Sequence, residues 1–133
     1  GEGAARCIKM AMKYLDRPVD YINPHATSTP GGELKEKGAV GAVWGEKVPL
    51  IAATKSLSGH SLGAAGVHEA IYSLLMLNNG FVCESAHIEE LDPAFEGLPI
   101  VRALQERKLN CVLSNSFGFG GTNASLAFTR LAA

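Results

Sequence analysis

The sequence of 133 residues predicts an α/β fold, in which helices pack against a mostly parallel sheet with an antiparallel end. Three observations support this prediction. Apolar residues recur at helical spacing near the start, short apolar runs each precede a polar loop and a helix, and two strand-like runs lie close together near the end. Apolar residues make up 47% of the chain and charged residues 19%, which is typical of one globular domain or part of one.

The first part of the chain predicts helix, strand and helix. Residues 2–15 are predicted as a helix because their apolar members recur every three or four positions, and Pro18 lies beyond its end. Residues 19–23 are predicted as a short strand. A turn-rich loop at 24–32 leads to a second helix at 33–44, which two glycines weaken by about 1 kcal/mol each relative to alanine.

The middle of the chain repeats this pattern. Residues 50–54 are apolar, as in a buried parallel strand, and the loop at 55–60 follows them. A long helix is predicted at 63–79, with Gly80 in the position of a helix-ending glycine. Between Val67 and Leu77 this helix is apolar on most sides, and we therefore expect it to be buried.

The last part of the chain predicts strands. A strand is expected at 81–83, whereas Pro and Gly residues interrupt any long element over 84–109. Residues 110–116 and 124–130 then favour two strands, joined by a glycine-rich loop at 117–123. This pair is the expected antiparallel end of the sheet.

Composition excludes several function classes. A net charge of −1 gives no basic field for nucleic acid, and no apolar run reaches the roughly 20 residues of a membrane span. The three cysteines, Cys7, Cys83 and Cys111, are an odd number without CxxC spacing, so we expect neither disulfides nor a zinc site, and a cytoplasmic setting. The chain lacks an initiating Met, and we expect it to be a piece of a longer protein.

Polar loops follow three of the predicted strands, at residues 24–32, 55–60 and 117–123. Loops at the carboxyl ends of strands line the site crevice of an α/β sheet. The first two loops contain His25 and His60, and a neutral imidazole can donate to an oxygen that gains negative charge. A single histidine is more often a surface or core residue without a role. The shared position of these two after apolar strands favours a functional pair.

Other loop residues leave alternatives open. Lys55 is either a solvated lysine or one held near the site by a carboxylate, Glu33 or Glu36. The hydroxyls of residues 27–29 either cap the following helix or bond a polar ligand chain. Residues 118–121 match no phosphate motif, since no Gly-Lys-Ser/Thr is present and a strand follows. They form either a plain hairpin or a loop whose backbone N–H faces an oxyanion.

Three segments share their order and spacing with the motifs of one enzyme family. Residues 23–30, NPHATSTP, are similar to N-x-H-G-T-x-T-P, and residues 54–66, TKSLSGHSLGAAG, to T-K-S-x-x-G-H-x-x-G-A-A-G. Residues 114–123, SNSFGFGGTN, contain the pattern N-S-F-G-F-G-G-x-N. The chain thus resembles the β-ketoacyl-acyl carrier protein synthases, of the synthase I type in bacterial type II fatty acid synthesis. It matches only the C-terminal part of that enzyme.

The resemblance implies a thiolase-like half, with a mixed five-stranded sheet packed against helices. It also implies a decarboxylating Claisen condensation, in which malonyl-carrier protein loses CO₂ and the resulting carbanion attacks an acyl group held on a cysteine. The implied partners are acyl carrier protein with its acyl and malonyl groups, the N-terminal half of the enzyme, and a second copy in a full-length homodimer. No cofactor, metal, nucleic acid or membrane is expected.

The same resemblance implies roles for individual residues. His25 and His60 would bind the malonyl thioester carbonyl and stabilise the enolate. Lys55 stands beside them, paired with Glu36 of the next helix. The backbone N–H of Phe119 would donate to an oxyanion, and its ring would gate the acyl pocket. The substrate-binding set is Thr27, Thr29, Phe117 and Phe119.

The chain also departs from the family pattern. The nucleophilic cysteine is expected upstream of this chain, and none of the three cysteines present is assigned that role. Ala26 stands where the family has glycine, Pro24 where it has a small residue, and Gly31 where it has a bulkier one. If residue 26 has a positive φ, alanine there costs about 1 kcal/mol or more and shifts His25.

These features support hypotheses from different classes. The first is a synthase C-terminal half that has no condensing activity alone, and the second adds residual decarboxylation of the malonyl group. The third is a non-catalytic half that docks a partner chain. A related thiolase-fold acyltransferase is a further alternative. A phosphate- or nucleotide-binding domain is disfavoured by the missing motifs. An isolated half is expected to expose apolar surface and to self-associate.

Overall fold

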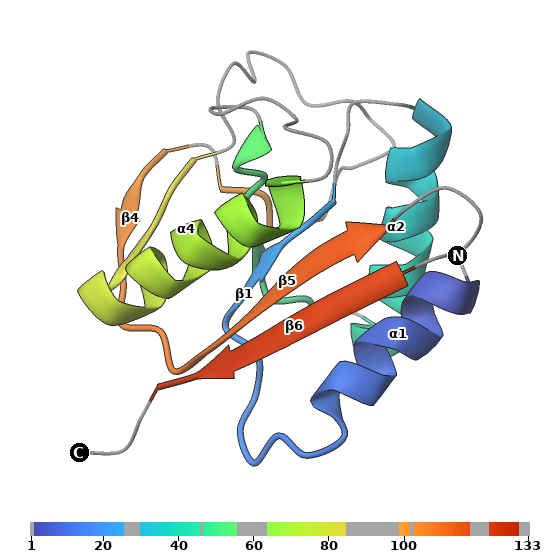
Figure 1. The fold of residues 1–133 in the computed structure, drawn as a ribbon, viewed down its shortest axis with the longest axis horizontal. Coiled ribbons are helices and arrows are strands. Elements are labelled where there is room, and N and C mark those ends of the chain that lie inside the picture. Colours follow the sequence, from blue (N-terminus) through green and yellow to red (C-terminus); the bar gives the residue numbers. More distant parts are fainter. Residues whose placement is uncertain are drawn as a thin grey trace.

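Helices and strands alternate along the chain as far as α4, and strands follow it, largely as predicted (Figure 1). The computed structural model describes residues 2–25, 30–45, 47–55, 64–84, 99–101, 103–117 and 123–130. The helices are α1 (Glu2–Met12), α2 (Pro30–Trp44) and α4 (Ala65–Asn79). The strands are β1 (Tyr21–Asn23), β2 (Leu50–Ile51), β3 (Phe81–Val82), β4 (Gln105–Glu106), β5 (Cys111–Phe117) and β6 (Asn123–Thr129).

The main sheet has the strand order β2-β1-β5-β6. The central strand β1 runs parallel to both neighbours, so that Tyr21 lies opposite Leu50 on one side and Val112 on the other. β6 returns antiparallel to β5 and pairs with it along its full length. The predicted mixed sheet, mostly parallel with an antiparallel end, is therefore confirmed.

The described residues place four strands in the main sheet, where the resemblance implies five. Beyond β2 the sheet continues by one residue pair, in which Ile100 bridges Ile51 in parallel. On either side of this bridge, Ile51 donates to the carbonyl of Pro99 and Val101 donates to the carbonyl of Ile51. The strand predicted at 81–83 is β3, and it pairs with β4, which the sequence did not predict.

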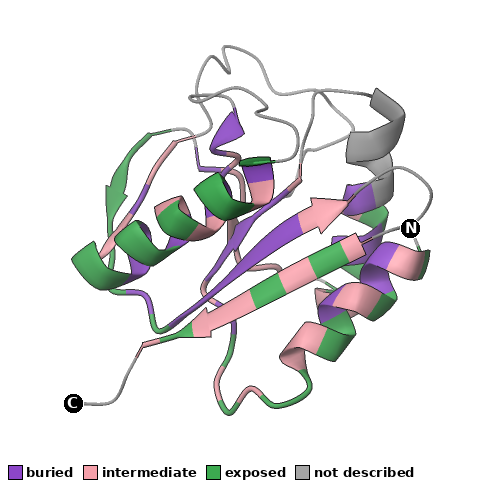
Figure 2. Ribbon diagram, viewed as in Figure 1, coloured by how far each residue is buried: buried purple, intermediate pink, exposed green. Residues whose placement is uncertain are grey.

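Side chains alternate across the main sheet and divide the core into two layers. On one face, Ile22 and Leu113 pack with buried residues of α1 and α2. On the other face, Tyr21 and Val112 pack against Met76 of α4. Figure 2 shows the buried residues concentrated along β1 and β5. Burying one apolar side chain of this size stabilises the fold by about 1.5–3 kcal/mol. The central strands β1 and β5 are therefore stably packed, and they hold the first residues of the loops that follow them in place.

Asp20 and Arg130 fasten the segments that lead into and out of the sheet. The Asp20 carboxylate accepts hydrogen bonds from the backbone N–H groups of Asn110, at 2.8 Å, and Cys111, at 3.2 Å. Arg130 donates to the carbonyl of Leu109 at 3.1 Å and to that of Leu77 near the end of α4. These bonds satisfy backbone groups where β5 begins and α4 ends.

The helix boundaries differ from the prediction by a few residues. α1 ends at Met12 instead of residue 15. α2 begins at Pro30, three residues before the predicted start, so the predicted loop at 24–32 is shorter. Proline suits the first turn of a helix because its missing N–H would have no helical partner there.

α4 lies over one face of the sheet and leaves an apolar face uncovered. Its buried positions are spaced three or four residues apart, whereas Val67, Ile71 and Leu75 have exposed fractions of 63%, 49% and 50%. The prediction that its apolar stretch is buried was therefore wrong for half of the helix, because the described residues supply a single sheet to cover it. None of the helices in the described ranges combines the length and apolar character of a membrane crossing.

Gly80 ends α4 in the left-handed conformation, with φ 69° and ψ 49°, and its N–H donates to the carbonyl of Met76 at 2.9 Å. We expect Gly80→Ala to lower the free energy of unfolding by about 1 kcal/mol, because alanine disfavours this conformation. The added methyl would lie 3.5 Å from the Arg107 carbonyl, an ordinary contact, so the effect would come from the backbone.

Urea unfolding measures this effect, with Gly38→Ala of α2 as the matched control. Nothing lies within 4 Å of the methyl that alanine would add at Gly38, and the residue is inside a helix. That substitution is expected to stabilise by about 0.5–1 kcal/mol. Equal effects of both substitutions would contradict the role of the left-handed backbone.

Candidate active site

Three motif loops begin at one edge of the main sheet. Because β2, β1 and β5 are parallel, their carboxyl ends lie at the same edge. Two residues after β1 comes His25, Lys55 follows β2, and Phe117 is the last residue of β5. The rings of His25 and Phe117 are 5.9 Å apart between centroids and tilted by 55°. Four other predicted site residues lie outside the described residues: Thr27, Thr29, His60 and Phe119.

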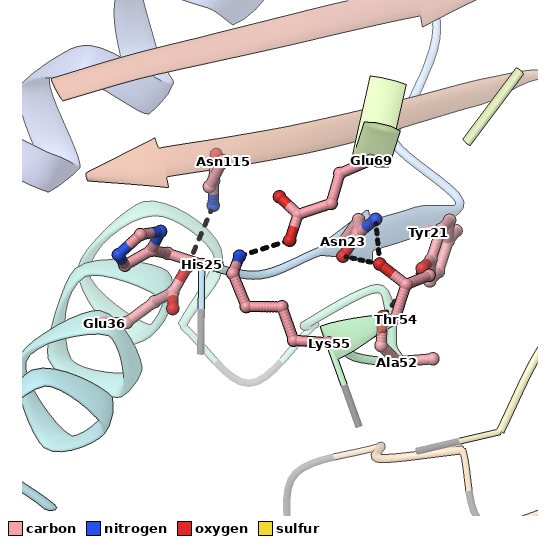
Figure 3. Close-up of polar contacts among 9 residues, drawn as sticks. All are labelled: Tyr21, Asn23, His25, Glu36, Ala52, Thr54, Lys55, Glu69 and Asn115. Atoms are coloured by element: carbon pink, nitrogen blue, oxygen red, sulfur yellow. Dashed lines mark hydrogen bonds and ion pairs between the residues drawn. The ribbon is translucent and has the colours of Figure 1, made fainter. Parts of the chain in front are cut away.

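The carboxylate of Glu36 holds the main chain of His25. Glu36 is buried on α2, and its Oε2 accepts a hydrogen bond from the His25 backbone N–H at 2.9 Å. The same oxygen accepts from Nδ2 of Asn115 on β5, at 3.4 Å (Figure 3). Hydrogen bonds to a charged acceptor are stronger than neutral ones, so this carboxylate restricts the backbone that positions the imidazole.

Asn115 is in turn held from β6. The hydroxyl of Ser125 donates to Oδ1 of Asn115 at 2.8 Å, and the two residues are paired in the β5–β6 register. Asn115 is fully buried, so water does not compete for its amide.

Lys55 forms a buried ion pair with Glu69 of α4. Its side chain is 6% exposed and that of Glu69 is 2% exposed. The predicted pairing of Lys55 with Glu36 was wrong. Glu36 extends from α2, whose buried residues pack on one face of the sheet, whereas Glu69 extends from α4 on the other face (Figures 1 and 3). Lys55 therefore pairs with the carboxylate on the α4 side of the sheet and not with the one on the α2 side.

Further buried polar contacts join β1 to the segment after β2. Asn23 donates through Nδ2 to the hydroxyl of Thr54 at 3.1 Å, and both side chains are buried. The Tyr21 hydroxyl donates to the carbonyl of Ala52 at 2.7 Å. Burial raises the pKa of Tyr21 well above its usual value, so this phenol stays a neutral donor. These bonds fix the spacing between the strands that precede His25 and Lys55.

The cysteines lack the surroundings of an activated nucleophile. Burial raises the pKa of Cys111 to about 11 and also raises the pKa of Cys83. A reactive cysteine needs a lowered pKa, because the thiolate is the nucleophile. Both thiols therefore fit structural positions. Cys7, on α1, is a free thiol like the other two.

Sequence reasoning missed Glu69, Asn115 and Ser125. Glu69 carried a usable signal, since a carboxylate within an otherwise apolar helix requires a buried partner. Asn115 lies within the quoted NSFGFGG segment, yet its side-chain partners depend on which face of β5 it occupies. Ser125 carried no signal, because a single serine in a predicted strand is ordinary.

The chain resembles known proteins over nearly its whole length. Residues 1–89 match the family model described as the C-terminal domain of beta-ketoacyl synthase. The 3-oxoacyl-[acyl-carrier-protein] synthase 1 of Escherichia coli strain K12 is 60% identical over 131 residues, which cover 98% of this chain and 32% of that protein. The chain thus spans about a third of the length of this relative.

Solved structures agree with this match. A beta-ketoacyl synthase from Burkholderia phymatum superposes with a TM-score of 0.91 at 34% identity, covering 98% of this chain and 33% of that one. A type II PKS ketosynthase, solved in complex with its acyl-carrier protein, superposes with a TM-score of 0.89 at 28% identity, covering 98% of this chain and 34% of that one. The predicted thiolase-like fold, with a mixed sheet packed against helices, is therefore confirmed.

Proposed function

Since the chain belongs to the β-ketoacyl synthase family, we propose that it is the C-terminal part of a 3-oxoacyl-acyl carrier protein synthase that elongates fatty acids. One observation carries this proposal. His25, Lys55 and Phe117 extend from the carboxyl ends of three adjacent strands, where the loops of the three motifs begin. An α/β sheet builds its reaction site at this edge.

In the proposed reaction, His25 and His60 donate hydrogen bonds to the carbonyl oxygen of a malonyl thioester. The bond to the carboxylate breaks, CO₂ leaves, and the electron pair becomes the enolate that the two imidazoles stabilise. The enolate carbon attacks an acyl thioester on a cysteine, and the C–S bond then breaks to release the thiolate and the 3-oxoacyl product. A neutral imidazole suits this step because one of its ring nitrogens carries a proton that it can donate to the enolate oxygen.

The remaining predicted residues support the same site. The backbone N–H of Phe119 is proposed to stabilise the oxyanion formed during attack, while Phe117 and Phe119 border the acyl chain. Thr27 and Thr29 are proposed to bond the arm that carries the malonyl group. Glu36 acts on His25 through its backbone N–H, which is the role that its 2.9 Å contact supports.

We infer that the acyl-bearing cysteine lies outside these 133 residues. The raised pKa values of Cys83 and Cys111 support this, as does the length of the chain, about a third of its relative. The full-length enzyme is expected to form 3-oxoacyl product from acyl- and malonyl-carrier protein, whereas this chain alone forms none. Robust condensation by the chain alone would overturn this inference.

We separately expect this chain alone to retain some decarboxylation of the malonyl group, because it contains both His25 and His60. The measurement is CO₂ release from malonyl-carrier protein, compared with the His60→Ala variant. Release that is unchanged in that variant would remove His60 from the step.

The exposed apolar face of α4 supports a partner within the same enzyme. Val67, Ile71, Leu74 and Leu75 lie on this face, and apolar patches on soluble proteins mark interaction sites. We propose that the N-terminal part of the synthase covers it, since the relative is about three times the length of this chain. Acyl carrier protein is the proposed substrate-bearing partner, in line with the ketosynthase that was solved with its carrier protein. A homodimer is proposed for the full-length enzyme.

The chain without its N-terminal part is expected to self-associate through this face, and Ile71→Glu is expected to suppress the association. Light scattering at high concentration measures the mass of both. Met10→Glu on α1 is the matched control, because Met10 is 74% exposed against 49% for Ile71. A monomeric unsubstituted chain, or equal suppression by the control, would contradict the role of α4.

A non-catalytic half that docks a partner chain remains the alternative function, and the same α4 face favours it. Reconstitution distinguishes the two functions. Adding the N-terminal part to this chain should restore condensation if His25 and His60 take part. A stable complex without turnover, or turnover that survives both histidine substitutions, would favour the alternative.

A further inference from the structure

A continuous run of hydrogen bonds connects the outer strand of the sheet to the main chain of His25. It starts at the hydroxyl of Ser125 on β6 and passes through the amide of Asn115 on β5, with an O–O distance of 2.8 Å. The amide nitrogen then contacts Oε2 of Glu36 on α2 at 3.4 Å. That oxygen also accepts the His25 backbone N–H at 2.9 Å. Three elements of the fold, β6, β5 and α2, thus converge on one backbone group.

We propose that Ser125 is a positioning residue for the reaction, because its hydroxyl anchors the Asn115 amide, whose nitrogen contacts the Glu36 carboxylate that holds His25. The inference rests on the proposed function, in which His25 donates to the thioester oxygen. It adds a residue of β6 that lies outside all three motifs.

The orientation of Asn115 decides whether it attracts or repels Glu36. An asparagine amide has a donating nitrogen at one end and an accepting oxygen at the other. The Glu36 carboxylate can only accept, so it requires the nitrogen end of the amide, and the oxygen end then accepts the proton of the Ser125 hydroxyl. A flipped amide would place its oxygen against the carboxylate, with no proton between two acceptors. In a buried site such a contact is strongly unfavourable, and Asn115 is fully buried.

The backbone presents the Ser125 hydroxyl in a fixed place. Ser125 lies directly opposite Asn115 in the antiparallel register of β5 and β6, and both strands are seven residues long. Directly opposed residues on one face of a sheet have neighbouring side chains. The serine therefore acts on the amide from a regular strand.

The first test compares Ser125→Ala with Ser125→Thr in the full-length synthase. Alanine removes the donor, and we expect kcat for condensation to fall about tenfold while KM for malonyl-carrier protein stays within about twofold. Threonine keeps the hydroxyl and suits a strand, so its kcat should stay within about twofold of the unsubstituted enzyme. An unchanged kcat in Ser125→Ala, or equal losses in both variants, would overturn the proposal.

The second test moves the negative charge from residue 36 to residue 115 in two steps. Asn115→Asp places two carboxylates together, and we expect a loss of about 10²-fold in kcat. Adding Glu36→Gln should recover at least about tenfold, because it removes one of the two negative charges that Asn115→Asp brings together. A folded double variant no more active than Asn115→Asp would overturn the proposal. If Asn115→Asp does not fold, the comparison of alanine and threonine at Ser125 decides.

His25→Ala separates this inference from the proposed function. If His25→Ala abolishes condensation while Ser125→Ala does not lower kcat, the positioning role fails and the proposed function stands. If His25→Ala retains full activity, the proposed function fails, and the inference fails with it.

Discussion

Replacing His25 by alanine in the full-length synthase is expected to lower kcat for condensation by about 10²–10³-fold. Removing one preorganised donor from a developing oxyanion has an effect of this size in other enzymes. The structure restricts the position of His25, because Glu36 accepts a hydrogen bond from its backbone N–H and the ring of Phe117 lies 5.9 Å from its imidazole. The measurement is the rate of 3-oxoacyl product formation with saturating acyl- and malonyl-carrier protein.

The same substitution should lower CO₂ release in parallel, because the enolate forms in the decarboxylation step. His60→Ala is expected to lower the rates of condensation and of CO₂ release to a similar extent. Tyr14→Ala provides a control, since it removes a ring just after α1 that is 87% exposed. A loss below about threefold for His25→Ala, with the protein folded, would remove this histidine from the mechanism.

Replacing Lys55 by methionine is expected to destabilise the protein by about 3–5 kcal/mol. The substitution leaves the Glu69 carboxylate buried at 2% exposure without the cation that neutralises it. Removing the cationic partner of a buried carboxylate is among the few changes that produce an effect this large. Urea unfolding of the full-length protein measures the loss, and a change below about 1 kcal/mol would contradict the importance of the pair.

The double variant Lys55→Met/Glu69→Leu separates stability from function. Replacing both members of a buried ion pair by apolar residues of similar size is often close to neutral for stability. We expect the double variant to recover most of the lost free energy of unfolding. Its condensation rate should nevertheless stay low, because the charge at the edge of the sheet is gone. Full recovery of activity would make the pair purely structural.

Much of the fold follows from local patterns in the sequence. The apolar run at 50–54 predicted a parallel strand, and its residues Leu50–Ile51 pair in parallel with β1 as β2. Gly80 marked the end of α4 because it takes the left-handed conformation that other residues avoid. Since loops after parallel strands meet at one edge, the common position of His25 and Lys55 followed as well.

Other features depend on information that no local pattern contains. The apolar run in α4 could not reveal which of its faces the sheet covers, because periodicity gives no partner. The choice between Glu36 and Glu69 as the partner of Lys55 depended on which layer each helix joins. The convergence of His25 with His60, like the places of Thr27, Thr29 and Phe119, stays a prediction.

The central position of β1 has a consequence for the order of folding. Its partner β5 comes late in the chain, and Asp20 bonds to Asn110 across a separation of 90 residues. Contacts so distant in sequence form slowly, because a long loop must close before they contribute. During synthesis one edge of β1 therefore lacks its neighbour until the ribosome has made β5. Such an unpaired edge is a template for aggregation, so chaperone dependence is expected to be greatest in that interval.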